Sequence, residues 1–502
     1  MTSQQWHLLL LSAAISSASG LASELLLGTL ASYLVGNEAL SYGIAVGGFL
    51  AAMGVGSYLS RFVGNQGNTL LTAFMTVELL IAPLNAMLPL GLFILFIIGG
   101  EIWLGLAFVT LILGTLAGLE IPLLTRMVET EKGVKDALAG VLAMDYFGAL
   151  VGSLAFPVVL LPLVGMFPAA AILGILPAVM VFFLGRAFPE FSQWRFFGLS
   201  IALLLTFFAI VVVPFSQRLE ENLYGAPIVG QTQSAYQRLV LTRRGNDLRL
   251  FLDGDLQFST TDEYRYHEAL VHPALSAVAE PKHILLLGAG DGLALREVLK
   301  WDSVEKITLI ELDPKVVEWA STYPALVAAN QNAFSDPRVN IIYGDAFQLV
   351  SEIEQTFDVI LADFPDPDRN VLAKLYSLGF YRQLQAHLSS QGVLVTQGSS
   401  PFFAPKAFSC IATTLEAINF KVYPYTVNVP SFGPWGFVLA TNRSLQPETG
   451  QPLPIPTRFL TPEILSSLFV LPKDMIIKDV DVNTLAHPVI VNYERDRRWI
   501  LY

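Results

Sequence analysis

Residues 284–294 read ILLLGAGDGLA, an apolar run followed at once by a glycine-rich turn and the start of a helical pattern. The run has the length of a buried strand, and Gly288, Gly290 and Gly292 allow the backbone to turn tightly and to approach a ligand. A strand, a glycine loop and a helix in this order are typical of nucleotide-binding α/β folds. Many unrelated proteins share this arrangement, so it predicts a fold class and no particular activity.

Short apolar runs further along the chain repeat the strand pattern, with helical stretches between them. This alternation predicts a parallel, doubly wound, Rossmann-like sheet of the methyltransferase type. Its predicted strands are 284–287, 307–310, 339–342, 359–361 and 393–396. Ahead of them, residues 236–241 alternate like a half-buried strand, Gly245-Asn246-Asp247 indicates a turn, and residues 248–252 form the returning strand. We therefore expect a small antiparallel β lobe at 228–260.

Acidic residues follow three of the predicted strands. Asp291 lies in the glycine loop, Glu311 ends the second strand, and Asp345 follows the third strand, just before Ala346. An acid at the second strand end can accept hydrogen bonds from both ribose hydroxyls, and one after the third strand can hold an adenine amino group. Together the three acids predict an adenosine site. Each carboxylate taken alone is equally consistent with a helix N-cap.

The fourth strand ends in Asp363-Phe364-Pro365-Asp366-Pro367. Two carboxylates on one loop at the carboxyl edge of the sheet, near Asp291, create a negative cleft. Ammonium groups with a lysine-like pKa of about 10.4 suit such a cleft, whereas neutral or anionic substrates do not. The loop predicts an oligoamine substrate. The alternative is a proline-stiffened turn with exposed acids.

The first 217 residues differ in composition from the rest. The whole chain of 502 residues is 53% hydrophobic and 14% charged, and residues 1–217 contain only six basic and ten acidic side chains. About 20 apolar residues cross a bilayer as a helix. Seven stretches qualify: 8–35, 40–63, 69–97, 102–125, 138–163, 167–185 and 196–214. The second is rich in glycines that predict close helix packing: Gly43, Gly47, Gly48, Gly54 and Gly56. We expect an α-helical, multi-pass bundle in a cell membrane.

The orientation of such a bundle is left open by two opposing arguments. Basic residues fall in the loops after the second, fourth and sixth spans: Arg61, Arg126, Lys132, Lys135, Arg186 and Arg195. The positive-inside rule makes these loops cytoplasmic, and seven crossings then put residues 218–502 outside. A co-substrate made in the cytoplasm argues for the opposite side. A re-entrant third segment, broken by Pro83, Asn85 and Pro89, would reconcile the two.

Four acids lie in or near the apolar stretches: Glu24, Glu78, Glu120 and Asp145. Carboxylates within a membrane usually face a bundle interior or a water path, which suggests a cation site, conceivably for a polyamine. The structural alternative, which we favour at this point, is a set of hydrogen-bonded or interfacial acids that hold helices together.

The composition also argues against several classes of protein. Neither half has the basic excess that nucleic-acid binding requires. Cys410 is the only cysteine, which rules out an intrachain disulfide and a thiolate metal cage. His267 and His272 lack a further ligand cluster, so we expect no metal. Neither a nucleophile elbow nor a phosphate-binding P-loop is present.

At this point the motifs resemble those of the spermidine synthases. Residues 252–257, Asp262-Glu263 and Tyr266-His267-Glu268 are similar to the front signature of that family. Residues 288–298, Glu311-Leu312-Asp313 and 363–381 are similar to its cofactor loop, second-strand acid and catalytic loop, in order along 218–442. The apolar front, with residues 118–126 and Asp145-Tyr146, resembles the membrane-bound branch of this family.

The resemblance implies that decarboxylated S-adenosylmethionine is the co-substrate and that no cofactor is bound permanently. Asp291 would bind its aminopropyl ammonium, and the loop glycines Gly288 and Gly290 would let the backbone approach the co-substrate. Glu311 would hold its ribose, and Asp345 with Ala346 its adenine.

The same resemblance implies an amine acceptor, putrescine or a related polyamine. Asp363 would be the general base, and Asp366 would anchor the far ammonium. Gln237, Gln257, Tyr266 and His267 would line the floor of the site and the amine channel. A homodimer is a further expectation.

Three positions depart from the family pattern. Asn370 stands where the family usually has a proline that packs on the adenosine, and Phe364 replaces a usually small residue. Residues 429–432, Val-Pro-Ser-Phe, lack the tyrosine of the family's late Pro-Thr-Tyr-Pro segment. Aminopropyl transfer is expected to be retained, and putrescine as the acceptor is open to question.

Two alternatives stand beside aminopropyl transfer. One is a methyltransferase on the same fold, although a methyltransferase has no evident need for Asp291, Asp363 and Asp366. The other is a polyamine sensor or transporter without turnover. The expected domains are a transmembrane part at 1–216, the β lobe at 217–260, the Rossmann-like domain at 261–445 and a C-terminal extension at 446–502.

Overall fold

The structure is a computed structural model that describes residues 2–35, 38–64, 67–446 and 453–496. Its contacts divide the chain into a helical unit, residues 1–227, and a sheet unit, residues 228–502. Parts of the predicted C-terminal extension, 447–452 and 497–502, lie outside the described residues. The domain boundaries given by the sequence stay predictions.

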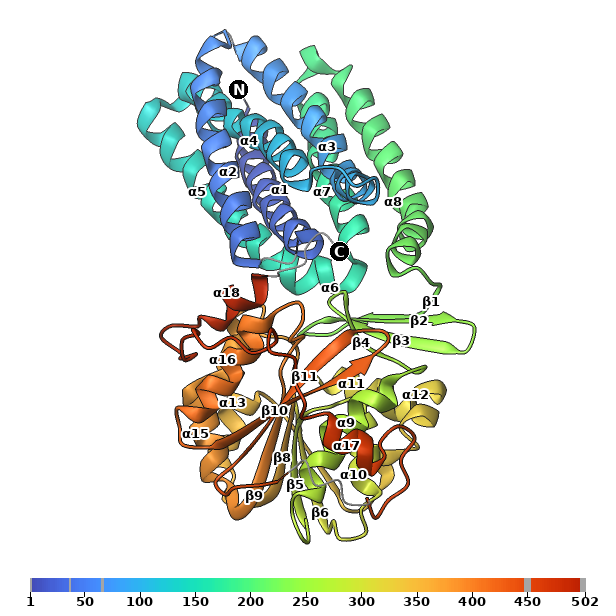
Figure 1. The fold of residues 1–502 in the computed structure, drawn as a ribbon. Coiled ribbons are helices and arrows are strands. Elements are labelled where there is room, and N and C mark those ends of the chain that lie inside the picture. Colours follow the sequence, from blue (N-terminus) through green and yellow to red (C-terminus); the bar gives the residue numbers. More distant parts are fainter. Residues whose placement is uncertain (1, 36–37, 65–66, 447–452, 497–502) are drawn as a thin grey trace. The chain divides into compact units, whose positions relative to one another are not determined.

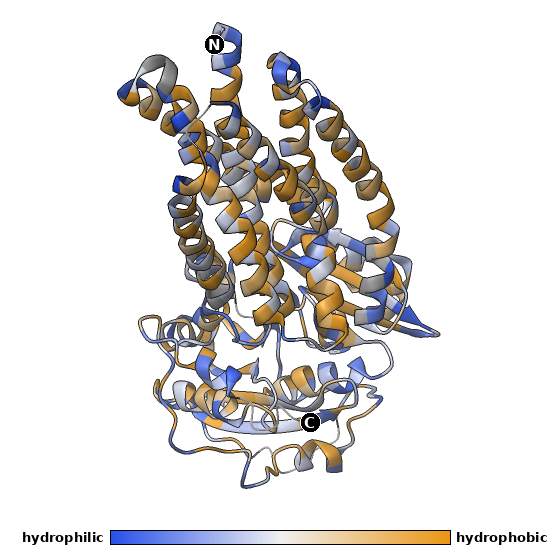
Figure 2. Ribbon diagram, turned by 90° about the horizontal axis from the view of Figure 1, so that it is seen from above, coloured by the Kyte–Doolittle hydropathy of each residue, from blue (hydrophilic) through white to orange (hydrophobic). Residues whose placement is uncertain are grey.

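The helical unit consists of apolar helices, all of them long except α6 (Figures 1 and 2). They are α1 (Ser3–Val35), α2 (Glu38–Leu59), α3 (Gly67–Ile97), α4 (Ile102–Lys132), α5 (Val134–Ala155), α6 (Leu161–Val164), α7 (Met166–Ala187) and α8 (Trp194–Tyr224), with a π-helical turn at Phe156–Leu160. By length and composition alone, seven helical segments among the described residues could cross a bilayer.

Small residues allow the backbones of these helices to touch. A Cβ atom on Gly118 of α4 would lie 2.1 Å from the carbonyl oxygen of Met53, and one on Gly56 of α2 would lie 2.0 Å from that of Thr115. Glycine is therefore needed where α2 and α4 meet. For three other glycines of α2 the packing prediction is wrong, because nothing lies within 4 Å of an added Cβ: Gly43, Gly47 and Gly54.

The break that a re-entrant third segment would require does not occur, because α3 runs without interruption from Gly67 to Ile97 with Pro83 and Pro89 inside it. A proline removes one backbone hydrogen bond and kinks a helix. Opening the helix would leave several more backbone groups without partners in an apolar bundle, which costs more.

The sheet unit begins with a four-stranded antiparallel sheet, in the order β1 (Ile228–Gln233), β2 (Arg238–Arg244), β3 (Asp247–Leu252) and β4 (Asp255–Ser259). Arg244 pairs with Asp247 across the turn at Gly245-Asn246, so the predicted hairpin is confirmed. The first strand of the hairpin differs from the prediction. It starts at Arg238, and four consecutive residues from Leu239 to Thr242 are buried, because both of its faces are covered.

The larger sheet has the order β10-β11-β9-β8-β5-β6-β7. Its parallel strands are those predicted, β5 (His283–Gly288), β6 (Lys306–Glu311), β7 (Val339–Tyr343), β8 (Phe357–Asp363) and β9 (Leu388–Gln397). The antiparallel pair β10 (Lys421–Val429) and β11 (Gly433–Thr441) was not predicted. The chain builds outward from β5 through β6 to β7, then returns to the other side of β5 with β8. A ligand crevice forms at such a reversal, beyond the carboxyl ends of the strands.

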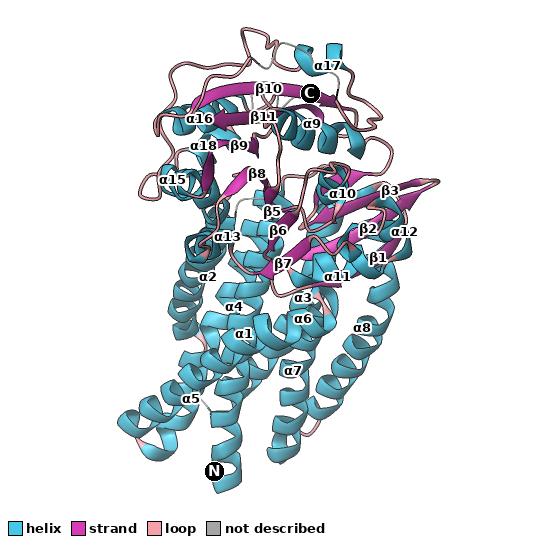
Figure 3. Ribbon diagram, turned by 90° about the horizontal axis from the view of Figure 1, so that it is seen from below, coloured by secondary structure: helices cyan, strands magenta, loops and turns pink. Residues whose placement is uncertain are grey.

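Helices cover both faces of this sheet (Figures 1 and 3). On one face, Leu285 and Leu287 pack toward α13 (Ala346–Leu349), α15 (Leu378–Ala386), α16 (Pro405–Glu416) and α18 (Ile490–Arg495). On the other face, Ile284 and Leu286 pack toward α9 (Glu263–Ser276), α10 (Leu293–Leu299) and α17 (Pro462–Ser467). This double coverage explains why the predicted strands are continuous apolar runs. Further helices are α11 (Pro314–Thr322), α12 (Pro324–Ala329) and α14 (Asn370–Ala373).

Candidate active site

The carboxyl ends of β5 and β8 meet at the chain reversal. Gly288 pairs with Asp363 across the two strands and has a φ of +79°. A Cβ atom on Gly288 would lie 2.1 Å from the carbonyl oxygen of Asp363. Only glycine fits this close approach, which places the glycine loop beside the acidic loop.

Asp363 is the last residue of β8 and is largely shielded from solvent. Its Oδ1 accepts a hydrogen bond of 2.6 Å from the hydroxyl of Tyr266 on α9. Burial raises the pKa of Asp363 to about 6; the cationic His267 and the Tyr266 hydrogen bond act to lower it, while Asp291 raises it further. A carboxyl group with this pKa is ionised near neutral pH and can still accept a proton, as a general base must.

Asp291 lies in the glycine loop, with its carboxylate turned back onto its own backbone. Its Oδ1 accepts a hydrogen bond of 2.9 Å from the N–H of Leu293, the first residue of α10. Burial raises its pKa, while His267 acts to lower it. The side chain therefore closes a turn just before α10, whose N-cap is Gly292, so the N-cap alternative is wrong for Asp291. Asp291 also belongs to the electrostatic neighbourhood of His267 and Asp363.

His267 of α9 is 2% exposed and supplies the positive charge of this cluster. Its Nδ1 hydrogen bonds to Glu263 Oε2 at 2.9 Å. Burial acts to lower the pKa of His267, but Glu263, Asp291 and Asp363 outweigh burial and raise this pKa to about 9. The ring is therefore an imidazolium at neutral pH.

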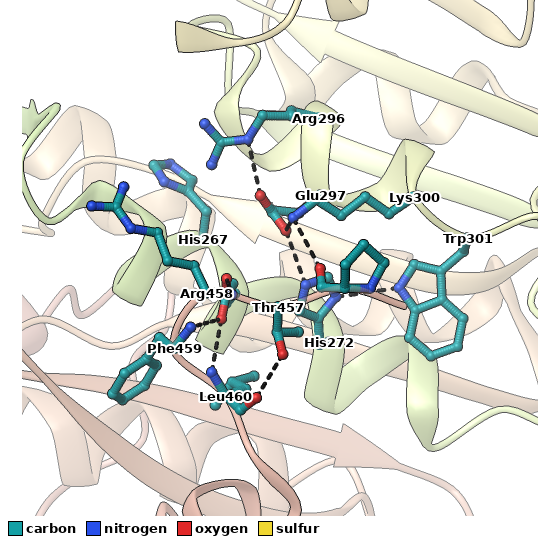
Figure 4. A network of polar contacts seen from close by, with 12 residues as sticks. His267, His272, Arg296, Glu297, Lys300, Trp301, Thr457, Arg458, Phe459 and Leu460 are labelled. Carbon is teal, nitrogen blue, oxygen red and sulfur yellow. Dashed lines mark hydrogen bonds and ion pairs between the residues drawn. The ribbon is translucent and has the colours of Figure 1, made fainter. Parts of the chain in front are cut away.

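A network of ion pairs and hydrogen bonds lies next to His267, and Figure 4 shows the part of it around Glu297. Arg296 of α10 donates to both carboxylate oxygens of Glu263, each at 2.9 Å, and to Glu297 Oε1 at 2.9 Å. Glu297 also accepts from His272 Nε2 at 3.0 Å and pairs with Lys300 at 2.6 Å. Such a network fixes its members in place, since every charge in it has a partner.

The sequence analysis quoted Glu263, Arg296 and Glu297 within family motifs but assigned no role to them. Charged residues within otherwise buried helices were the available signal: Glu263 is 5% exposed, Arg296 8% and Glu297 1%. The contact between α9 and α10 that joins them depends on the tertiary fold.

Glu311 lies beside the glycine loop, as predicted. It ends β6, is 8% exposed, and accepts a hydrogen bond of 3.0 Å from the N–H of Asp313. Burial raises its pKa to about 7. A Cβ atom on Gly290 would lie 2.5 Å from Glu311 Oε2, so this glycine lets the loop rest against the carboxylate.

Asp345 is the N-cap of α13, with its Oδ1 accepting from the N–H of Phe347 at 3.0 Å. Its other oxygen forms an ion pair with Lys374, and the following Ala346 is buried. The structure therefore shows the capping role and a cation already on this acid. An adenine contact stays a prediction.

Asp366 belongs to the same neighbourhood as Asp363. Its Oδ1 accepts from Gln397 Nε2 at 3.3 Å, and Gln397 Nε2 also contacts the Tyr376 hydroxyl at 2.5 Å. The charges of Asp363 and Asp366 both act on the buried hydroxyls of Tyr266 and Tyr376. The sequence analysis assigned no role to Gln397 and Tyr376, which join the acidic loop to β9.

The two predicted glutamines are placed differently. Gln237 Nε2 donates to Asp313 Oδ2 at 3.1 Å, next to the end of β6. Gln257 Nε2 instead donates to the carbonyl oxygen of Asp255 in its own strand. The structure brings Gln237 near Glu311 and does not bring Gln257 into contact with the acids.

The segment that lacks the family's tyrosine presents an aromatic wall instead. The centroid of the Phe432 ring lies 6.2 Å from that of Tyr266 and 5.2 Å from that of Trp435. Trp435 Nε1 is buried and has no hydrogen-bond partner among the described residues. Of the other departures, Phe364 packs in the core against Tyr376 and Phe380, and Asn370 is exposed at the start of α14.

Comparisons with known proteins show the family to which the chain is similar. Residues 263–448 match the spermine/spermidine synthase domain family. The polyamine aminopropyltransferase 2 of Ralstonia nicotianae is 40% identical over 98% of this chain and 99% of its own. The polyamine aminopropyltransferase of Leptospira interrogans is 38% identical over 98% of both chains. A crystal structure of spermidine synthase in complex with the transition-state analogue AdoDATO is 28% identical, with a TM-score of 0.46 over 49% of this chain and 88% of that one.

Proposed function

This chain belongs to the polyamine aminopropyltransferase family and transfers aminopropyl groups, and from that premise we propose that putrescine is its acceptor and Asp363 its general base. The aminopropyl donor in this proposal is decarboxylated S-adenosylmethionine. One observation carries the assignment of the base: the half-buried Asp363 combines a hydrogen bond from Tyr266 with a pKa raised to about 6.

The chemistry needs alignment more than activation, because a sulfonium is already a good leaving group. The amine nitrogen of the acceptor attacks the aminopropyl carbon bonded to the sulfonium sulfur. The carbon–sulfur bond breaks, its electron pair stays on sulfur, and neutral methylthioadenosine leaves. The proton released by the attacking amine passes to Asp363. A positioned base of this kind contributes about 10²–10⁴-fold.

We assign the donor to the glycine loop and the end of β6. Asp291 binds the aminopropyl ammonium, and Glu311 binds the ribose hydroxyls, an assignment supported by its burial against Gly290. Asp345 and Ala346 hold the adenine, for which Lys374 must share or release the carboxylate of Asp345. His267 holds Asp291 and Asp363 beside one cation before the substrates arrive.

We assign the acceptor to the acidic loop and the aromatic wall. Asp366 binds the far ammonium, while Tyr266, Phe432 and Trp435 line the path of the methylene chain. Aromatic faces attract ammonium groups within about 6 Å of the ring. A phenylalanine at position 432 therefore retains the attraction of a ring face but lacks a hydroxyl acceptor.

The acceptor is tested with the purified full chain and radiolabelled decarboxylated S-adenosylmethionine. Putrescine, cadaverine, 1,3-diaminopropane and spermidine are supplied one at a time, and methylthioadenosine is measured. The proposal expects the highest kcat/KM for putrescine. A higher value for any other amine overturns putrescine as the acceptor while leaving aminopropyl transfer intact.

We further propose that seven helices of the helical unit cross a cell membrane. Large apolar side chains on their outer surfaces support this, including Leu104 at 71%, Phe207 at 67% and Ile210 at 69% exposure. So many exposed apolar groups are unfavourable in water and favourable in lipid. Contact with lipid and a homodimer in the membrane belong to the same proposal.

The side on which the sheet unit lies can be read by cysteine labelling. The single native cysteine, Cys410, is fully buried, so an added surface cysteine is the reactive one. We expect a cysteine at exposed Asp474 to be protected from an impermeant maleimide in intact cells, because the co-substrate is supplied from the cytoplasm. Labelling in intact cells overturns that placement and favours the opposite side, as the positive-inside rule does.

A further inference from the structure

A small polar cavity lies inside the otherwise apolar helical unit. Helices α1, α2, α3 and α4 enclose it, and its lining residues are Ser16, Ser19, Gly20, Ser23, Phe49, Glu78, Ile81, Asn85, Leu113, Ala117 and Glu120. The volume of the cavity is about 10 Å³, counted as the space that the centre of a water molecule can occupy. This is room for roughly one water-sized group.

The polar groups of this cavity are buried and incompletely paired. Glu78 is 1% exposed and accepts a hydrogen bond from the Ser16 hydroxyl. Glu120 is 4% exposed and has no hydrogen bond or ion pair to any residue that the structure describes. Asn85 is 1% exposed, and neither its Nδ2 nor its Oδ1 has a partner in the described part of the chain.

Asn85 lies in α3 between two prolines. Pro89 has no N–H to donate to the backbone carbonyl of Asn85, four residues earlier in the helix. Asn85 therefore has both an unpaired side-chain amide and a backbone carbonyl that lacks its usual helical hydrogen bond. Buried polar groups left without partners cost free energy, so such a residue is better explained by a ligand than by packing.

The charge of the lining has one sign. Two carboxylates line the cavity, and no lysine, arginine or histidine does. The charged groups that act on Glu120 are Glu78 and Asp145, which are also acids. Carboxylates inside an apolar bundle are stabilised by a cation, and nothing within this lining supplies one.

The size and the mixed lining indicate which cation fits. A primary ammonium is close to water in size and has three N–H donors, which Glu78, Glu120 and Asn85 Oδ1 can accept. The space holds the ammonium group alone, and the apolar lining residues Phe49, Ile81, Leu113 and Ala117 would contact the first methylene groups where the alkyl chain leaves the cavity. The lining also carries the hydroxyl oxygens of Ser16, Ser19 and Ser23, so an inorganic cation is the other possible occupant, and the competition experiment below distinguishes the two.

We propose that this cavity binds the primary ammonium group of a polyamine, as a second amine site separate from the active site. The site is built entirely from helices of residues 1–227, so the proposal does not depend on which residues of the sheet unit catalyse the reaction. The ligand of this cavity would carry the same primary ammonium group as the amines on which this family acts. Free ammonium is the other possible ligand of this kind.

The test measures equilibrium binding of radiolabelled putrescine to the full chain in detergent. Asp363→Asn and Asp366→Asn are introduced together to weaken the amine site of the sheet unit. We expect one putrescine per chain to remain bound in this background. Adding Glu120→Gln or Asn85→Leu weakens that binding at least about tenfold, the loss expected when a buried charged partner is removed.

Glu24→Gln is the matched control. Glu24 is a buried acid of α1, 5% exposed, and does not line the cavity. This variant should bind putrescine like its parent. Turnover of Glu120→Gln in the otherwise unchanged chain shows that the protein is folded, because Glu120 lies outside the catalytic unit.

Competition identifies the source of the group. Butylamine should displace putrescine, whereas ammonium chloride and sodium chloride at equal concentration should not. Displacement by either salt overturns the polyamine assignment in favour of an inorganic cation. Absence of the second site, or equal binding by the Glu120→Gln variant, overturns the site itself and leaves Glu78 and Glu120 as acids that hold helices together. Neither result bears on aminopropyl transfer.

Discussion

In the sheet unit, buried Glu263 receives two hydrogen bonds from Arg296 and one from His267, whereas buried Glu120 of the helical unit receives none from any described residue. Both acids are almost fully shielded, at 5% and 4% exposure. Burial alone therefore does not distinguish a structural carboxylate from one that awaits a ligand. The partners distinguish them. The charge of a paired buried acid is already compensated, whereas the charge of an unpaired one can be compensated by a bound cation.

The sheet unit also contains a cluster of acids at its candidate active site, each of which accepts a hydrogen bond. Asp291, Asp363 and Asp366 gather where β5 and β8 end, and His267 is the imidazolium whose charge acts on two of them. In the proposed mechanism, this cluster of negative charge lies where the sulfonium and the amine meet.

The largest effect is expected at the proposed base. Asp363→Asn removes the proton acceptor but keeps the shape of the side chain, so turnover should fall by about 10²–10⁴-fold. Binding of the aminopropyl donor should change little, since Asp363 faces the amine. Single-turnover kinetics and donor binding by equilibrium dialysis measure the two separately.

Asp474→Asn is the control, because Asp474 is exposed and outside the site. Unchanged turnover in the Asp363→Asn variant would show that another group takes the proton.

The second largest effect is expected on stability, from a substitution that removes the partner of a paired buried acid. Arg296→Met leaves Glu263 and Glu297 buried without their arginine, which should cost about 3–5 kcal/mol in the free energy of unfolding. Thermal unfolding of the full chain, followed by tryptophan fluorescence, measures the loss. Lys282→Met, which breaks the exposed pair with Glu305, should leave the unfolding temperature unchanged. Equal losses in both variants would mean that burial of the network adds nothing.

Much of this arrangement follows from local sequence patterns. Continuous apolar runs located β5, β6, β7, β8 and β9, and the residues at their ends placed Glu311 and Asp363 at the crevice. The antiparallel pair was missed because β10 contains Pro424 and β11 begins with Gly433-Pro434, which usually indicate a turn. An edge strand tolerates a proline, because one side of it has no pairing partner.

The site shows where local patterns stop being informative. The sequence left Asp345 open between an adenine contact and an N-cap, and the capping hydrogen bond is visible only in the folded chain. The pair of Glu263 and Arg296 joins residues of two helices, and its existence depends on how α9 packs against α10. Gln257 belongs to a family motif, but its side chain does not reach the acids of the site as expected.

A smaller effect is expected from the hydrogen bond between Tyr266 and Asp363. That bond acts to lower the pKa of Asp363, so Tyr266→Phe should raise this pKa above about 6. The base must be ionised to work. The acidic limb of the pH profile of kcat/KM should therefore move to higher pH, by about one unit, with little change on the alkaline side. Tyr323→Phe, on a tyrosine outside the site, should keep the original profile, and an unmoved limb in Tyr266→Phe would separate this tyrosine from the base.

The smallest effect is expected for Glu120→Gln, which should raise the free energy of unfolding, whereas Arg296→Met should lower it. Without amine, Glu120→Gln removes an unpaired buried acid and should raise the free energy of unfolding by about 1 kcal/mol. In the sheet unit, Glu263→Gln should lower it, because Glu263 is already paired. Adding putrescine should raise the unfolding temperature of the parent chain more than that of the Glu120→Gln variant, so the difference between them should shrink or reverse. If Glu120→Gln instead destabilises the chain in the absence of amine, the acid has a partner within the bundle and the contrast between the two units is lost.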